Sequence, residues 1–328
     1  ERQNDLTSQL AVACLGAGVI TTVAVAQGQN PLTALGITLF LNIQAVIGLA
    51  VILVMGLHPG LGLLLPLGFE QGPGQALSLG KAWEDTGLVD GGQIGLIIAA
   101  LGFGWAIAGG VPMAVWGRKK GLLSADRGEA GVAEAAEGAT SAGEPGALDA
   151  LTLHLAVIGL VYLVTYAIVS GLAALFASMP GIAAMAWGFH FIFGAIVAIG
   201  LRTILKRAGV RPLRNDLLAH VAGLTVDVVT CAAISAVQIA IFKANFLPII
   251  VLTTLGGVCT AFISLWLASR AFPRAPFEHG ILLYGAATGT LPVGLALLRI
   301  VDPEFRTPAS LNSVLGAAMS VPLAAVFM

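Results

Sequence analysis

Residues Gly68–Gln75 interrupt an apolar stretch with the sequence Gly-Phe-Glu-Gln-Gly-Pro-Gly-Gln. Each glycine inside a helix costs about 1 kcal/mol and a proline costs about 3 kcal/mol, so we expect a helix–break–helix hairpin over residues 58–80. Glu70 places a carboxylate at the break, and hard cations prefer carboxylate and carbonyl oxygens. Glu70 is therefore a candidate cation ligand or proton carrier. The alternative is that it only solvates the tip of the hairpin.

A second interruption of the same kind lies at residues 285–292, inside a hairpin that we expect over residues 277–298. Half-helices that start at such a break can direct the positive, N-terminal ends of their dipoles at a carboxylate group, while free carbonyl oxygens can bind sodium. This mechanism needs small residues and proline, and both breaks supply them. The candidate substrate-binding residues are Gly68, Gln71, Gly72, Gly74, Gln75, Thr288, Gly289, Thr290 and Pro292.

Two polar residues in other apolar stretches are further candidates for binding a coupling ion. Asp227 lies within an expected span and shares a helix face with Thr230, three residues later. An interhelical hydrogen bond is the equally weighted alternative for this carboxylate. Thr254 lies in the expected span 246–269, where its hydroxyl could instead bond its own backbone.

The composition indicates what kind of chain must position these residues. Of 328 residues, 57% are hydrophobic and 10% are charged, and the net charge is −1. Soluble domains carry about 25% charged residues, so this surface cannot be solvated by water, and no basic region is available for a nucleic-acid partner. No Ser-His-Asp, Cys-His or paired-carboxylate arrangement stands out, so we expect no enzyme and no cofactor. The expected class is an all-α polytopic membrane protein.

The charged residues cluster between apolar stretches that are long enough to span a membrane, which needs about 20 helical residues. The expected spans cover residues 8–26, 32–56, 91–116, 151–176, 180–201, 217–242, 246–269 and 309–328. Residues 118–150 are rich in Ala, Gly and Glu and cannot bury a core, which indicates a flexible linker.

The basic residues predict the orientation of the chain in the membrane. If the linker is cytoplasmic and both hairpins return to the side they left, only Arg2, Lys81 and Lys243 of the 16 Lys and Arg residues fall outside. This asymmetry agrees with the positive-inside rule. We therefore expect a multi-pass protein of the cytoplasmic membrane.

The order span, span, hairpin, span occurs twice in the chain, at residues 8–116 and 217–328. Equivalent elements lie about 215 residues apart, and Gly72 falls opposite Gly289. We expect an incomplete first repeat over residues 1–117 and a second repeat over residues 151–328. Two further helices before Glu1 would complete ten spans, of which this chain holds eight. Inverted repeats with broken elements near the midplane are typical of secondary transporters.

Two motifs resemble those of bacterial sodium/glutamate symporters. Gln44-Ala-Val-Ile-Gly48, followed by His58-Pro-Gly-Leu-Gly-Leu-Leu, is similar to the Gln-Asn-x-x-Gly helix that precedes a Gly-Gly-His-Gly-Thr hairpin in that family. Gly289-Thr-Leu-Pro292-Val-Gly-Leu-Ala296 is similar to the second hairpin motif, Gly-x-x-Pro-x-x-x-Ala. The resemblance implies two opposed re-entrant hairpins, a homodimer and sodium-coupled uptake of glutamate. It also adds Gln44 to the coupling-ion candidates, because this residue matches the glutamine of the family.

The chain departs from the family at two points. Ala45 stands where the family has asparagine, and the first hairpin carries Glu70 and no histidine. Near an anionic substrate, Glu70 would repel carboxylates unless it were protonated or bound to sodium.

Together these patterns predict a sodium-coupled symporter of a small anionic solute, with substrate bound between the two hairpin tips. A proton-coupled or exchange carrier for another small carboxylate is the first alternative, with Glu70 and Asp227 as proton carriers. A channel or a non-transporting membrane scaffold is the second.

Overall fold

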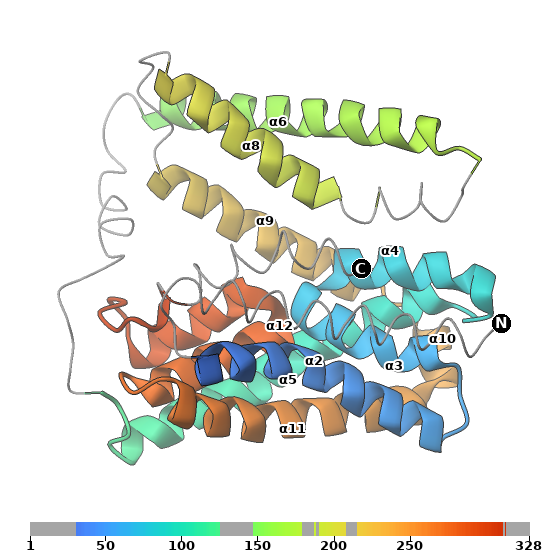
Figure 1. Ribbon diagram of the computed structural model, residues 1–328, viewed down its shortest axis with the longest axis vertical. Coiled ribbons are helices and arrows are strands. Elements are labelled where there is room, and N and C mark those ends of the chain that lie inside the picture. The colour runs from blue at the N-terminus through green and yellow to red at the C-terminus, as the bar shows by residue number, and fades with distance from the viewer. Residues whose placement is uncertain are drawn as a thin grey trace. The chain divides into compact units, whose positions relative to one another are not determined.

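The computed structural model describes residues 31–124, 147–178, 187, 190–207, 215–310 and 312, and these residues form helices and connecting turns without a strand (Figure 1). Four of the described helices are long and apolar enough to cross a membrane. An unbroken helix of 25 to 29 residues would be about 37–43 Å long, which exceeds the ~30 Å hydrocarbon core. The four are α5 (Gly91–Lys119), α6 (Ala147–Leu175), α11 (Phe246–Ala271) and α12 (Pro276–Val301). The chain is thus a multi-pass membrane protein with four candidate spans.

Three of these helices coincide with the expected spans 91–116, 151–176 and 246–269, whereas α12 covers the expected hairpin 277–298. Helix α2 (Pro31–Val54) coincides with the expected span 32–56 to within two residues at each end. The expected span 8–26 and nearly all of 309–328 lie outside the described residues.

Two expected spans differ from the helices observed. Helix α8 (His190–Arg207) continues six residues beyond the end of the expected span 180–201, whose first part is largely outside the described residues. Where one helix was expected over 217–242, the structure has α9 (Asn215–Ser235) and α10 (Ile239–Ala244). Gln238 between them is extended, with φ −85° and ψ 109°. Hydropathy does not predict this break, because most residues on both sides of it are apolar.

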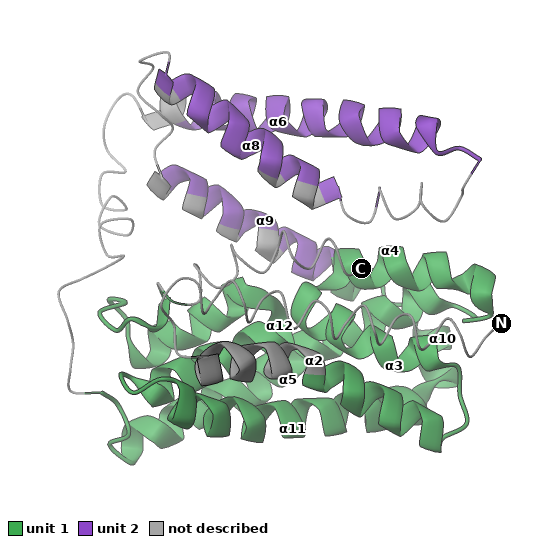
Figure 2. Cartoon of the chain, viewed as in Figure 1, with its two compact units in different colours: residues 1–132, 233–328 green, residues 133–232 purple. Residues whose placement is uncertain are grey.

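The chain divides into two compact units, residues 1–132 with 233–328 and residues 133–232 (Figure 2). In the second unit, α6 packs against α8, but most of its side chains are exposed, including Tyr162 and Leu163. Such a surface is suited to hydrocarbon. The expected boundaries at 117 and 150 follow the repeat and stay a prediction, and residues 125–146 of the expected linker lie outside the described residues.

The first unit contains a broken helical segment that starts at a proline and breaks at a glycine. His58 caps α3 (Pro59–Pro66), because its Nδ1 atom accepts a hydrogen bond from the Gly60 N–H at 3.2 Å. The π-helical turn η1 (Leu67–Gln71) follows and ends at Gly72, which has φ 91° and ψ −177°. Helix α4 (Pro73–Ala82) then starts with a second proline at its first position, where a missing N–H has no cost. The short turn η2 (Trp83–Thr86) leads to α5.

Helix α12 is also broken, although its length and composition match those of a span. Its backbone leaves the helical region at Gly289 (φ −141°, ψ 23°) and Thr290 (φ 72°, ψ 162°). A Cβ atom on Gly285 would lie 2.7 Å from the Cα atom of Gly294. Nine residues of straight helix would separate these two positions by about 13 Å, so α12 folds back on itself at the break.

An apolar core fixes the base of this folded helix against α5. Tyr284, Ile281 and Leu298 are fully buried there. The hydroxyl of Tyr284 donates a hydrogen bond to the carbonyl oxygen of Trp105 at 2.7 Å, which ties α12 to α5. The core comprises Ala114, Phe277, Ile281, Leu282, Tyr284, Leu297, Leu298, Val301, Phe305 and Ala309.

Candidate functional site

Both broken segments, α3–η1–α4 and α12, pack against helix α5. At its first turn, the backbone of Gly91 contacts that of Gly80 in α4. At its last turn, Gly117 contacts the ring of Phe277 at the start of α12. The two broken segments therefore contact α5 at its opposite ends, the first through Gly80 and the second through Phe277.

The two segments reach the same glycine in the middle of α5. A Cβ atom on Gly102 would lie 2.5 Å from the carbonyl oxygen of Thr288 and 2.8 Å from Cδ1 of Phe69. Gly102 lies about 17 Å along the helix from Gly91 and about 23 Å from Gly117. Only a residue without a side chain fits there, because the Thr288 carbonyl of α12 and the Phe69 ring of η1 occupy the space.

Gly72 and Thr290, which both have a positive φ at the breaks, contact each other. A Cβ atom on Gly72 would lie 3.0 Å from Cγ2 of Thr290. Thr290 is one residue after Gly289, the residue that the sequence places opposite Gly72 in the second repeat. Gly289 instead packs between α5 and its own helix, because its Cβ position faces Ala106 and Val293 at 3.0 Å.

Gln44 of α2 contributes a buried amide next to the second break. Its side chain is 2% exposed, and its Nε2 atom donates hydrogen bonds to the carbonyl oxygen of Ala287 at 2.6 Å and to Oγ1 of Thr260 at 2.9 Å. The bond to Ala287 fixes the orientation of the amide, because a carbonyl can only accept. Oε1 of Gln44 has no donor among the described residues. A buried acceptor of this kind is suited to a cation or to a donor group of a ligand.

The first break adds a carboxylate and two further amides. Glu70 and Gln71 lie in η1 and are half-buried, and π-helical turns occur frequently at functional sites. Gln75 in the first turn of α4 is 9% exposed, and its Oε1 atom lacks a donor in the described part of the chain. Gly68 packs closely on α5, where its Cβ position would lie 2.8 Å from Cγ2 of Ile98. Side-chain oxygens that could bind a ligand therefore lie on both sides of Gly72 in the chain, at Glu70 and Gln75.

The second break offers mainly backbone groups. Thr288 is fully buried, and its hydroxyl donates to the carbonyl oxygen of Tyr284 at 2.7 Å. Thr290 is half-buried, while Pro292 and, at the first break, Gly74 are exposed.

Two candidates from the sequence are not placed with the others. Asp227 belongs to α9 in the second unit, and its side chain is outside the described residues. Thr254 is half-buried on α11, and it is Thr260, six residues later, whose hydroxyl meets Gln44. Thr260 was missed, although it lies 216 residues after Gln44, close to the repeat spacing, which could have identified it. Gly102 carried no such signal.

The electrostatics of the two breaks are simple. Glu70 is the one charged side chain in residues 67–75 and 285–293. Helix α4 and the second limb of α12 both start at the breaks, so the positive ends of two helix dipoles point there. The described residues contain no group of three His, Cys, Asp or Glu that could hold a metal ion. A cation at the breaks would therefore rely on one carboxylate and on amide, hydroxyl and carbonyl oxygens.

Compared with models of protein families, with curated proteins and with solved structures, the chain matches none. The resemblance to sodium/glutamate symporters rests on the two motifs described above. The candidate site is identified by the contacts between the two breaks and Gln44.

Proposed function

We propose that this protein is a sodium-coupled secondary transporter of the cytoplasmic membrane that carries a small anionic solute, glutamate-like by resemblance. The observation that carries the proposal is the meeting of two broken helices: they pack on α5 from opposite ends and touch where Gly72 faces Thr290. Two opposed re-entrant hairpins would have this geometry. A homodimer is part of the same proposal by resemblance.

Equivalent contacts support an inverted repeat in the first unit. Gly48 of α2 contacts Gly62 of α3, and their equivalents 217 or 218 residues later are Leu265 of α11 and Gly280 of α12. A Cβ atom on Gly280 would lie 2.8 Å from Cδ2 of Leu265, so the same helix crossing recurs. The expected hairpins also both begin with a proline at the first helical position.

Two contacts between residues at or within one position of equivalence indicate where a pseudo-two-fold axis would pass. Residues that touch their own symmetry mates lie on the axis. Gln44 bonds to Thr260, 216 residues later, and Gly72 contacts Thr290, 218 residues later. An axis through these contacts would pass through the site itself. A site on the axis of an inverted repeat can open to either side by exchanging the conformations of the two halves, as alternating access requires.

The chemistry of the breaks suggests how sodium and solute would be coupled. The dipoles of α4 and the second limb of α12 favour a carboxylate group of the solute. The negative charge of Glu70 would repel the carboxylate group of the solute, so an anion would bind well only after a cation neutralises Glu70. Oε1 of Gln44 and Oε1 of Gln75 are further oxygens without donors in the described part of the chain. Sodium would then favour the loaded state by its differential affinity, which produces coupled transport.

The test is uptake of labelled glutamate, aspartate and other small carboxylates by the full protein in proteoliposomes. An inward sodium gradient is compared with a potassium gradient for the wild type and for Glu70→Gln. Asp85→Asn is the matched control, because Asp85 is an exposed carboxylate outside the breaks. Sodium-dependent uptake that Glu70→Gln abolishes and Asp85→Asn retains would support the proposal.

Other outcomes select the alternatives. Uptake that ignores sodium and follows an imposed pH gradient would identify a proton-coupled or exchange carrier. Currents far above carrier turnover would identify a channel. The absence of flux for every solute would overturn the transport proposal and leave a membrane scaffold.

A further inference from the structure

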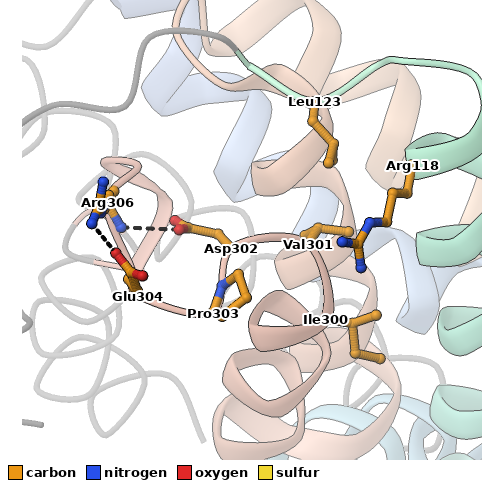
Figure 3. A pocket seen from close by; sticks show the side chains of 8 residues that line it. All are labelled: Arg118, Leu123, Ile300, Val301, Asp302, Pro303, Glu304 and Arg306. Atoms are coloured by element: carbon orange, nitrogen blue, oxygen red, sulfur yellow. Dashed lines mark hydrogen bonds and ion pairs between the residues drawn. The ribbon is translucent and has the colours of Figure 1, made fainter.

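A polar cavity lies away from the two breaks, at the end of α12. Its volume is about 160 Å³, and it lies between the last turn of α5 and residues 300–306 (Figure 3). The residues that line it are Arg118, Leu123, Ile300, Val301, Asp302, Pro303, Glu304 and Arg306.

The two carboxylates of this cavity are engaged within their own loop. Asp302 is 5% exposed and accepts hydrogen bonds from the Arg306 N–H at 3.0 Å, the Thr307 N–H at 2.8 Å and the Thr307 hydroxyl at 2.7 Å. Glu304 forms an ion pair with the Arg306 guanidinium. Hydrogen bonds therefore satisfy the carboxylate of Asp302, and an ion pair satisfies that of Glu304.

Arg118 faces this loop from the opposite wall of the cavity. Figure 3 shows its guanidinium directed toward Ile300 and Val301, whereas the carboxylate of Asp302 is turned toward Arg306. No carboxylate lies within ion-pair distance of Arg118 among the described residues. A guanidinium with free donors beside a hollow is suited to a phosphate group, which it can bind through two parallel hydrogen bonds.

The surroundings favour a phosphate that belongs to a lipid. Arg118 is followed directly by Lys119 and Lys120, and Arg299 lies 5.2 Å from the ring centre of Phe305 in the same loop. In the orientation that the basic residues predict, these residues lie at the cytoplasmic face, where the membrane carries anionic headgroups and basic pockets bind them. Leu123, Ile300 and Val301 add an apolar wall that an acyl chain could contact.

We propose that this cavity binds a phosphate group, as the headgroup of an anionic phospholipid or as free phosphate, with Arg118 as its main ligand. The site is separate from the solute site, and the inference does not depend on which solute is carried. Because residues 302–307 follow the second limb of α12 directly, a bound headgroup would also restrain that limb.

The test measures thermal unfolding of the full protein in nanodiscs of phosphatidylcholine with and without phosphatidylglycerol. Native mass spectrometry of the same samples counts the phosphatidylglycerol that stays bound. The variants are Arg118→Gln, Arg118→Lys and the control Arg274→Gln, which removes a charge from an exposed residue that does not line the cavity. A third lipid-free arm adds inorganic phosphate to protein in neutral detergent, against chloride at equal ionic strength.

We expect phosphatidylglycerol to raise the melting temperature of the wild type and of Arg274→Gln. Arg118→Gln should bind phosphatidylglycerol about tenfold more weakly. Arg118→Lys keeps the charge but cannot form two parallel hydrogen bonds, so its affinity should lie between those of the wild type and Arg118→Gln. If Arg118→Gln does not fold, Arg118→Lys still decides the outcome, because a diffuse charge effect predicts no change for it. Protection by inorganic phosphate alone, lost in Arg118→Gln, would identify free phosphate as the ligand. Equal losses in Arg118→Gln and Arg274→Gln, or no effect of either phosphate source, would overturn the proposal.

Discussion

Gly72 and Thr290 touch each other at the meeting point of the two broken helices, and both have the same rare backbone conformation. Gly72 has φ 91° and ψ −177°, and Thr290 has φ 72° and ψ 162°. This region is populated almost only by glycine, so a threonine there stores about 1–3 kcal/mol of strain. Such strain persists only where the surrounding packing enforces it, and backbone outliers of this kind cluster at functional sites.

Replacing Thr290 with glycine is expected to stabilise the protein while lowering its uptake rate. The substitution releases the strain, and the added freedom of the unfolded chain offsets about 0.4–1 kcal/mol of that gain. The net increase in the free energy of unfolding should be about 1 kcal/mol, measured by denaturant titration in detergent. Thr290→Ala is the matched control, because it removes the contact with Gly72 but keeps a side chain in the strained conformation. Equal stability of the two variants would contradict the strain.

Gly102→Ala is expected to push the two broken segments apart. The new methyl group would collide with the Thr288 carbonyl and the Phe69 ring, and overpacking of this kind costs about 1–3 kcal/mol. Gly104→Ala, two residues later, meets no atom within 4 Å and should gain up to about 1 kcal/mol from its helix propensity. Uptake in proteoliposomes should fall only for Gly102→Ala. A stabilising effect of both substitutions would show that the breaks do not meet at Gly102.

Gln44→Leu is expected to weaken sodium activation more than solute binding. It removes the free oxygen and leaves the Ala287 carbonyl without its donor, which costs about 1–3 kcal/mol of stability. The sodium concentration for half-maximal uptake should rise about tenfold or more, since 1.4 kcal/mol corresponds to a factor of ten. Thr260→Ala removes one partner of Gln44 but keeps its free oxygen, so the sodium requirement should change much less. Equal shifts in the two variants would assign Gln44 a purely structural role.

Tyr284→Phe is expected to lower stability without changing the solute KM. The substitution removes one buried hydrogen bond to Trp105, worth about 0.5–1.5 kcal/mol, and leaves the aromatic ring in place. Tyr162→Phe is the control, because Tyr162 is 63% exposed on α6. The free energy of unfolding and the concentration dependence of uptake measure the two effects separately. A raised KM with unchanged stability would place Tyr284 in the solute site instead.

The sequence by itself determined those features that depend on residues close to one another along the chain. A composition with so few charges requires a membrane, and runs of about 20 apolar residues place α5, α6 and α11 because a helix must satisfy its backbone inside hydrocarbon. The breaks at Gly72 and at Gly289–Thr290 were also predictable, because glycine and proline weaken a helix wherever they occur.

Only the tertiary structure decided which distant residues meet. Thr260, and not Thr254, reaches Gln44, because the rotation of α11 against α2 is set by packing and not by local preference. Gly102 became the meeting point of the two breaks for the same reason, and Arg118 faces the loop at Asp302 although 184 residues separate them in the chain. Hydropathy is an average over a window and has no direction around the helix. Contacts between helices depend on that direction, so they had to come from the fold.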